Sequence, residues 1–313
     1  MEIVELFQYR PGLIVIYNEI PWQGGKCRSD RKSILDYLLE QENTDSEKNS
    51  LRPYSGEFTV NSLRRFRRAV DALFYTTRPR KIFNPIIEAW QNFHLSFSTF
   101  TLPARPAKVT NREITKRPWN NLLTTLRKSK GLKNYVWKAE LQENNNIHFH
   151  MLSDLFLKHD ELRNIWNNSL NAVGAIDKFY AKWGHYSPNS TDIHTVNNYL
   201  EAQNYLQKYV SKKTLNEAAQ HWSDKEKELY RISKVWDCST GLRGKKYYTA
   251  PPGNEEKDFI ERELEAGNLR AIVKDYFTLL LPTRKKAQIA YPKSIYRQIL
   301  THYRSQPKQP ICS

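Results

Sequence analysis

Long apolar runs and an export signal are both missing from this sequence. No stretch of about 18 consecutive apolar residues occurs, which is the length that a membrane-crossing helix needs. The first ten residues, MEIVELFQYR, lack the basic start and the apolar stretch of a secretory leader. We therefore expect a protein without a membrane partner.

Cysteine is scarce, and a phosphate-binding nucleotide motif is missing. Cys27, Cys238 and Cys312 lie far apart and are odd in number, so they offer neither a disulfide framework nor a zinc spacing. This usage favours a reducing compartment, and we expect a cytoplasmic location. No G-x-x-x-x-G-K-[ST] motif occurs, which excludes a P-loop helicase activity in this chain.

Acidic residues are outnumbered by basic ones. The chain has 33 Asp and Glu against 49 Lys and Arg, a net charge of +16, and such an excess attracts polyanions. The cations are interleaved with 8 Trp, 18 Tyr and 13 Phe, a mixture that suits nucleic acid better than lipid. The same aromatic residues predict a packed core, and 313 residues suffice for one large domain or two smaller ones.

Strand and helix patterns alternate along the chain after a polar loop at 40–56. Strand patterns cover 93–103, 134–142 and 147–152, a possible hairpin covers 234–249, and helical patterns cover 61–81, 113–130, 155–171, 196–212 and 255–281. Because the clearest strand pair is a hairpin, we expect an α+β fold with an antiparallel sheet.

The segment ENNNIHFHML, residues 143–152, carries two histidines one residue apart. His148 and His150 point to the same side of a strand, where two imidazoles can bind one divalent cation. Glu140 is the candidate third ligand, provided that the hairpin loop has an odd number of residues, either three or five. This set suits Mg²⁺ or Mn²⁺ with open positions. The alternative is that the histidines are half-buried strand residues.

A second pattern, QNYLQKYVSKK at 203–213, places two tyrosines on one helix face. Tyr205 and Tyr209 are four residues apart, and Lys208 and Lys212 each follow a tyrosine by three positions. Lysine charge lowers the effective pKa of a nearby phenol, which favours a nucleophilic role. The alternative is an aromatic stripe in the core.

Three segments occur in the order of a known family's motifs: FSTFTLP at 97–103, YVWKAELQENNNIHFHML at 135–152 and YLQKYVSKK at 205–213. The chain resembles HUH endonucleases, in particular the rolling-circle replication initiators of small single-stranded-DNA phages and plasmids, over about residues 60–245. The resemblance implies a central antiparallel sheet of about five strands with helices packed on it. It also implies helices outside the sheet, and we expect the N- and C-terminal extensions to be helical.

The resemblance also implies roles for the residues of both patterns. Tyr209 matches the nucleophile, Tyr205 the second tyrosine of two-tyrosine members, and the site lysines those that flank the tyrosines. The metal ligands would be His148, His150 and Glu140. The implied partners are a single-stranded DNA origin and the helicase and DNA polymerase of a bacterial host.

We expect three regions: an N-terminal extension at 1–58, an endonuclease domain at 59–250 that begins with a basic helix, and a C-terminal extension at 251–313 with a basic tail. Candidate DNA-binding residues are Arg64, Arg65, Arg67, Arg68, Arg243, Lys245 and Lys246. The arginines at 64–68 are also compatible with a solvated helix face. Rival functions are a tyrosine transposase, a relaxase and a non-enzymatic DNA-binding protein. Zinc deamination is disfavoured because no P-C-x-x-C follows the histidines.

Overall fold

The chain forms two compact units in the computed structural model. The structure describes residues 6–17, 60–84, 87–106, 109–199, 201–202, 221–274, 277–283 and 288–306. The larger unit contains the central part of the chain, and the terminal unit combines residues from both of its ends. Within the described residues, no helix has both the length and the apolar character that crossing a membrane requires.

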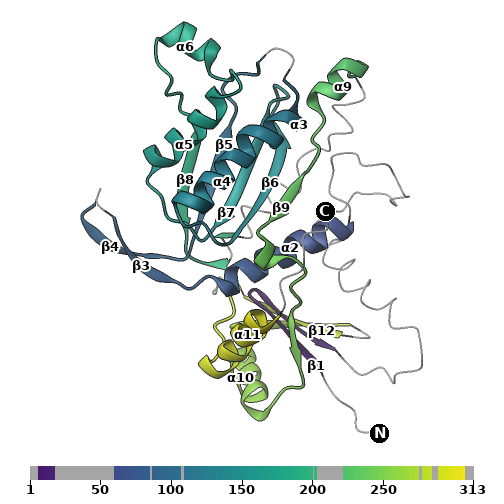
Figure 1. Cartoon of the computed structure of the whole chain (residues 1–313). Coiled ribbons are helices and arrows are strands. Elements are labelled where there is room, and N and C mark those ends of the chain that lie inside the picture. Colours follow the sequence, from purple (N-terminus) through teal and green to yellow (C-terminus); the bar gives the residue numbers. More distant parts are fainter. Residues whose placement is uncertain are drawn as a thin grey trace. The chain divides into compact units, whose positions relative to one another are not determined.

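The larger unit is built on a central five-stranded antiparallel sheet, as predicted (Figure 1). Its strands, in spatial order, are β8 (Thr191–Val196), β5 (Leu95–Thr101), β7 (Ile147–Ser153), β6 (Tyr135–Leu141) and β9 (Trp236–Cys238). The strand that carries both histidines is therefore the middle one. A middle strand is held by hydrogen bonds on both edges, which fixes the direction of its side chains.

The β6–β7 hairpin has the three-residue loop that the sequence allowed. Gln142 and Asn146 close the loop through a backbone hydrogen bond of 3.0 Å, and the register continues with Glu140 opposite His148. Asn145 takes the left-handed φ of 61° that the turn requires, a conformation that asparagine tolerates better than most residues. The odd loop length turns Glu140 to the same face as both histidines.

Helices cover one face of this sheet. They are α3 (Asn111–Ile114), the π-helical turn η1 (Thr115–Trp119), α4 (Asn120–Ser129) and α5 (His159–Asn171). Trp119 stacks on Phe149 of β7 with ring centroids 4.2 Å apart, and both side chains are fully buried. The predicted irregularity at Pro118 is the π-helical turn, since proline lacks the N–H that a regular helix uses there.

Helix α2 (Val60–Thr76) packs on the opposite face through its apolar stripe. Phe66 meets the ring of Trp236 edge-on at 5.4 Å, and the Trp236 indole donates a 2.6 Å hydrogen bond to Ser62. Trp236 is paired with Lys138, so its side chain points to the same face as Lys138 and Glu140. The basic helix therefore lies on the face that carries the candidate metal ligands.

A two-stranded ribbon, β3 (Arg80–Asn84) and β4 (Ala89–Phe93), extends from this unit (Figure 1). The remaining short elements of the larger unit are α6 (Asp177–Trp183), α9 (Asp224–Tyr230) and the 3-10 turn η2 (Thr240–Leu242). Cys238 on β9 is buried, and burial, with the nearby Asp237 carboxylate, raises the pKa of its thiol to about 12. The other two cysteines lie outside the described residues.

The terminal unit holds a second antiparallel sheet with two helices. Its strands, in spatial order, are β10 (Tyr248–Ala250), β1 (Leu6–Arg10), β2 (Leu13–Tyr17), β12 (Phe277–Pro282) and β11 (Leu269–Val273). The helices are α10 (Asn254–Glu265) and α11 (Lys293–Ser305). The described residues of the N-terminal extension, 6–17, thus form a β-hairpin and not a helix.

Two local predictions were wrong. Residues 255–281 are a helix only as far as Glu265, because Gly267, at a left-handed φ of 65°, follows the helix end and two strands come after it. The hairpin predicted at 234–249 does not form, since β9 pairs with β6 whereas β10 pairs with β1 in the terminal sheet. Local pattern identifies a strand but not its partner.

Candidate metal centre

The three predicted ligands come together on two neighbouring strands. Glu140 on β6 lies directly opposite His148 on β7, and His150 follows on the same face. The ligand atoms of all three residues lie within 4.8 Å of one another. Their side chains are buried or half-buried, so the site lies in a partly water-excluded place.

One contact defines how His150 faces its neighbours. Its Nε2 lies 3.1 Å from Glu140 Oε1, while its Nδ1 lies 3.2 Å from the Thr99 hydroxyl on β5. If Nδ1–H donates to the hydroxyl oxygen, Nε2 presents its lone pair on the side of Glu140, and this tautomer follows from the geometry. A metal-bound histidine typically donates its second ring N–H in this way.

The separations fit a small dication. A cation that lies about 2.0–2.6 Å from each ligand keeps the ligand atoms within about 4–5 Å of one another. Two neighbouring octahedral ligands at about 2.1 Å from an ion are about 3.0 Å apart, close to the 3.1 Å between His150 and Glu140. Two imidazoles and one carboxylate can therefore hold a metal ion here and leave positions open.

A buried cation and a row of rings surround the ligands. Lys138 Nζ lies 3.5 Å from Glu140 Oε2, and the lysine is only 7% exposed, so the carboxylate balances a buried positive charge. The His148 and His150 rings stack at 4.5 Å, and the Phe97 ring stacks on His150 at 5.5 Å. His194 of β8 follows at 5.3 Å from Phe97. These contacts hold the ligand rings in place.

Thr99 and Phe97 are supporting residues that the sequence patterns did not single out. They alternate along β5 on the face of the histidines, with Thr99 paired to His150 and Phe97 to Leu152. Strand alternation in FSTFTLP gives the face of each residue relative to its own strand. Which residue of β5 meets His150 depends on the register between strands some 50 positions apart, which no local pattern gives.

The predicted tyrosine helix lies outside the described residues. The stretch 203–220, which includes Tyr205, Tyr209, Lys208 and Lys212, falls between the described ranges that end at 202 and begin at 221. The meeting of a phenol with the metal ligands therefore stays a prediction.

The predicted DNA-binding residues fall into different surroundings, and their role also stays a prediction. On α2, Arg65 is exposed, whereas Arg64, Arg67 and Arg68 are half-buried. Arg243 donates to both carboxylate oxygens of Asp237 at 3.0 Å, and Lys245 is 5% exposed. Lys246 belongs to the terminal unit, where its backbone bonds Gln306. Arg65 is thus the arginine of this group most open to a phosphate.

Residues 95–214 match a family of replication-associated proteins, the ORF2 type. The match begins with β5, includes all three candidate ligands and ends after the tyrosine pattern. Searches among curated proteins and among solved structures gave no match. The family match associates this part of the chain with DNA replication.

Proposed function

We propose that this protein is a metal-dependent HUH endonuclease that nicks and rejoins single-stranded DNA at an origin and so initiates rolling-circle replication. The observation that carries the proposal is the cluster of Glu140, His148 and His150, whose ligand atoms lie within 4.8 Å of one another inside the family match. A divalent ion, Mg²⁺ or Mn²⁺, held by these residues would polarise the scissile phosphate when bound.

The reaction assigned to the chain is a transesterification. The phenol oxygen of Tyr209 attacks the phosphorus, a P–O bond to the tyrosine forms, and the bond from phosphorus to the 3′ oxygen breaks. The phenol proton leaves to solvent, and the 3′ oxygen takes up a proton to become a free hydroxyl. Tyr205 would take its turn in a second, reversing step, and Lys208 and Lys212 would favour the phenolate of each tyrosine.

Positive charge around the ligands supports this proposal. Lys138 adds a buried ammonium group beside Glu140, which favours a phosphate at the open positions. Helix α2 lies on the ligand face and presents Arg65 to solvent, where it can contact the DNA backbone. The free 3′ hydroxyl would serve a host DNA polymerase, and a host helicase would open the duplex.

The test is covalent capture of DNA. The protein is incubated with the single-stranded form of the replicon that carries its gene, with Mn²⁺ or with EDTA, and adducts are separated on a denaturing gel. We expect an adduct only with metal, and expect its loss in the Tyr205→Phe/Tyr209→Phe double variant and in His150→Ala. Tyr199→Phe, a buried tyrosine at 6% exposure, is the matched control and should retain the adduct.

Two results would count against the proposal. The first is tight DNA binding with no adduct from the wild type, which favours a non-enzymatic DNA-binding protein. The second is an adduct that survives in the double tyrosine variant. Mapping the cut to a transposon end or a transfer origin would reassign the same chemistry to a transposase or a relaxase.

A further inference from the structure

The β3–β4 ribbon has two unlike faces. In the register, Lys81 pairs with Asn92 and Phe83 with Trp90, so these four side chains share one face, which we call the outer face. All four are exposed. The alternation runs opposite to that of a buried sheet, because the aromatic pair lies on the solvent side.

The other face of the ribbon is held against the larger unit. Phe93 is fully buried and meets Phe156 edge-on at 5.6 Å. The Arg80 guanidinium lies over the Phe93 ring and donates a 3.0 Å hydrogen bond to the carbonyl of Asp154. These contacts fix the root of the ribbon and leave the outer face turned away from the protein.

Two aromatic rings are presented together on the outer face. Trp90 is 68% exposed and Phe83 is 47% exposed, and their centroids lie 5.8 Å apart. An exposed pair of large rings on a two-stranded ribbon gains little from the fold, and such patches mark binding surfaces. Flat rings of this kind are the surfaces on which unstacked nucleic-acid bases stack.

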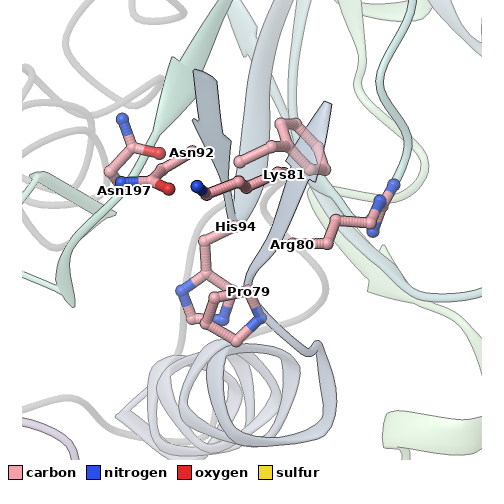
Figure 2. Close-up of a pocket in the computed structure, with 7 residues that line it drawn as sticks. Pro79, Arg80, Lys81, Asn92, His94 and Asn197 are labelled. Atoms are coloured by element: carbon pink, nitrogen blue, oxygen red, sulfur yellow. The ribbon is translucent and has the colours of Figure 1, made fainter. Parts of the chain in front are cut away.

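A shallow pocket continues the outer face at the root of the ribbon. Figure 2 shows the Lys81, Asn92 and Asn197 side chains gathered on one side, with Arg80 directed away from them. The cavity volume is about 430 Å³, within the range of small-ligand sites. Its amide and ammonium groups can hydrogen-bond a base edge or a phosphate.

We propose that the outer face of the β3–β4 ribbon, formed by Lys81, Phe83, Trp90 and Asn92, binds single-stranded DNA, with bases stacked on Phe83 and Trp90. This inference rests on the proposed function, whose substrate it helps to hold. The ribbon precedes the family match, which begins at residue 95, so the surface is an addition specific to this chain's own segment.

Charge and connectivity favour a DNA strand over an apolar protein partner. The ribbon and its approach carry Arg78, Arg80 and Lys81, all exposed, against the single acid Glu88 among the described residues there. β4 runs through His94 into β5, the strand whose Thr99 contacts His150. A strand stacked on the ribbon is thereby bound by an element that continues directly into the metal-ligand sheet.

The experiment measures DNA affinity without cleavage. Fluorescence anisotropy follows the full chain binding a fluorescein-labelled oligothymidylate of about 20 nucleotides in EDTA, which prevents metal-dependent chemistry. Trp90→Ala should weaken binding by about 5- to 100-fold, the loss of one base–aromatic stack. Trp90→Phe should retain most of the affinity. Gln91→Ala, on the inner face of the same strand, is the matched control and should bind as the wild type does.

Abasic and duplex probes of the same length identify the contact. Stacking predicts that the difference between wild type and Trp90→Ala disappears on the abasic strand and on the duplex. Equal affinities of the two proteins for oligothymidylate, or an equal loss on the abasic strand or on the duplex, would overturn the proposal and leave the ribbon to a protein partner. His148→Ala should keep full affinity, so a failure of nicking is separable from a failure of the ribbon to bind DNA.

Discussion

Thr99 decides which nitrogen of His150 faces the metal site. Its hydroxyl lies 3.2 Å from Nδ1, on the far side of the ring from Glu140. Removing the hydroxyl frees the ring to rotate or to change tautomer, and losses of about 10- to 100-fold in metal affinity are typical for such supporting contacts. We therefore predict a loss of that size for Thr99→Val in Mn²⁺ titration calorimetry.

The matched control for Thr99→Val is Thr195→Val. Thr195 belongs to β8 of the same sheet but is paired with Ser96, so it points to the helical face and away from the ligands. It should bind Mn²⁺ as the wild type does. Equal Mn²⁺ affinities for Thr99→Val and the wild type would show that the hydroxyl does not orient His150.

His94 gives the larger unit a pH-dependent stability. Burial lowers the pKa of His94, although its Nε2–H donates to the carbonyls of Thr77 and Phe74 at 2.9 and 3.0 Å. The unfolded chain, with an ordinary histidine pKa of about 6.5, therefore takes up the proton first as the pH falls. Its contribution to stability is complete above about pH 6.5 and is lost as the pH falls towards the lower folded pKa, by at most about 1.4 kcal/mol per pH unit.

Thermal unfolding at a series of pH values measures this contribution. Between about pH 7.5 and pH 5, the wild-type melting temperature should fall more than that of His94→Gln, which cannot take up a proton at this position. Parallel curves for the two proteins would contradict the assignment of a buried neutral imidazole.

At the scale of elements, the β6–β7 turn should be sensitive to its conformation. Asn145 has a φ of 61°, and a β-branched residue in this region costs about 1–2 kcal/mol. Asn145→Val should therefore lower the free energy of unfolding by about that amount in urea titrations, whereas Asn145→Gly should be tolerated. Glu143→Val, in the same loop at an exposed position, should cost less. A smaller loss for Asn145→Val than for Glu143→Val would be the opposite of this expectation.

The same hairpin shows what local sequence can predict. The alternation around His148 and the turn-forming asparagines led to the three-residue loop and to the placement of Glu140, because both depend on neighbours in sequence. The pairing of Thr99 with His150, and of β10 with β1, joins segments far apart in the chain. Those registers depend on packing of the whole sheet, so pattern alone could not give them.

Charge was also an incomplete guide to surface roles. Lys245 is among the cations expected to contact DNA, yet it is only 5% exposed, and Arg243 is engaged by Asp237. Sequence gives the number of cations but not which of them are buried or paired. Exposure distinguishes Arg65 from its neighbours on α2.

At the scale of the whole molecule, the net charge of +16 predicts DNA binding that weakens steeply with salt. For a single strand, each phosphate contact contributes about 0.7 to the slope of log affinity against log salt. Arg65→Ala should therefore reduce that slope by about 0.7, measured by anisotropy over a range of salt concentrations. An unchanged slope would remove Arg65 from the DNA contacts.

Arg163→Ala is the matched control for the salt series. Arg163 lies on α5, on the helical face of the sheet, and its guanidinium pairs with Asp160 at 2.6 Å. Its removal should leave the slope of log affinity against log salt unchanged. Together the two variants distinguish a DNA-binding face from a general attraction of the basic chain.

The most direct test of the metal centre is pulsed EPR of the Mn²⁺-loaded protein. We expect couplings from two histidine nitrogens in the wild type, from one in His148→Ala or His150→Ala, and weaker Mn²⁺ binding in Glu140→Gln. Mn²⁺ that binds without nitrogen couplings, or couplings that persist when both histidines are replaced, would contradict a single ion held by Glu140, His148 and His150.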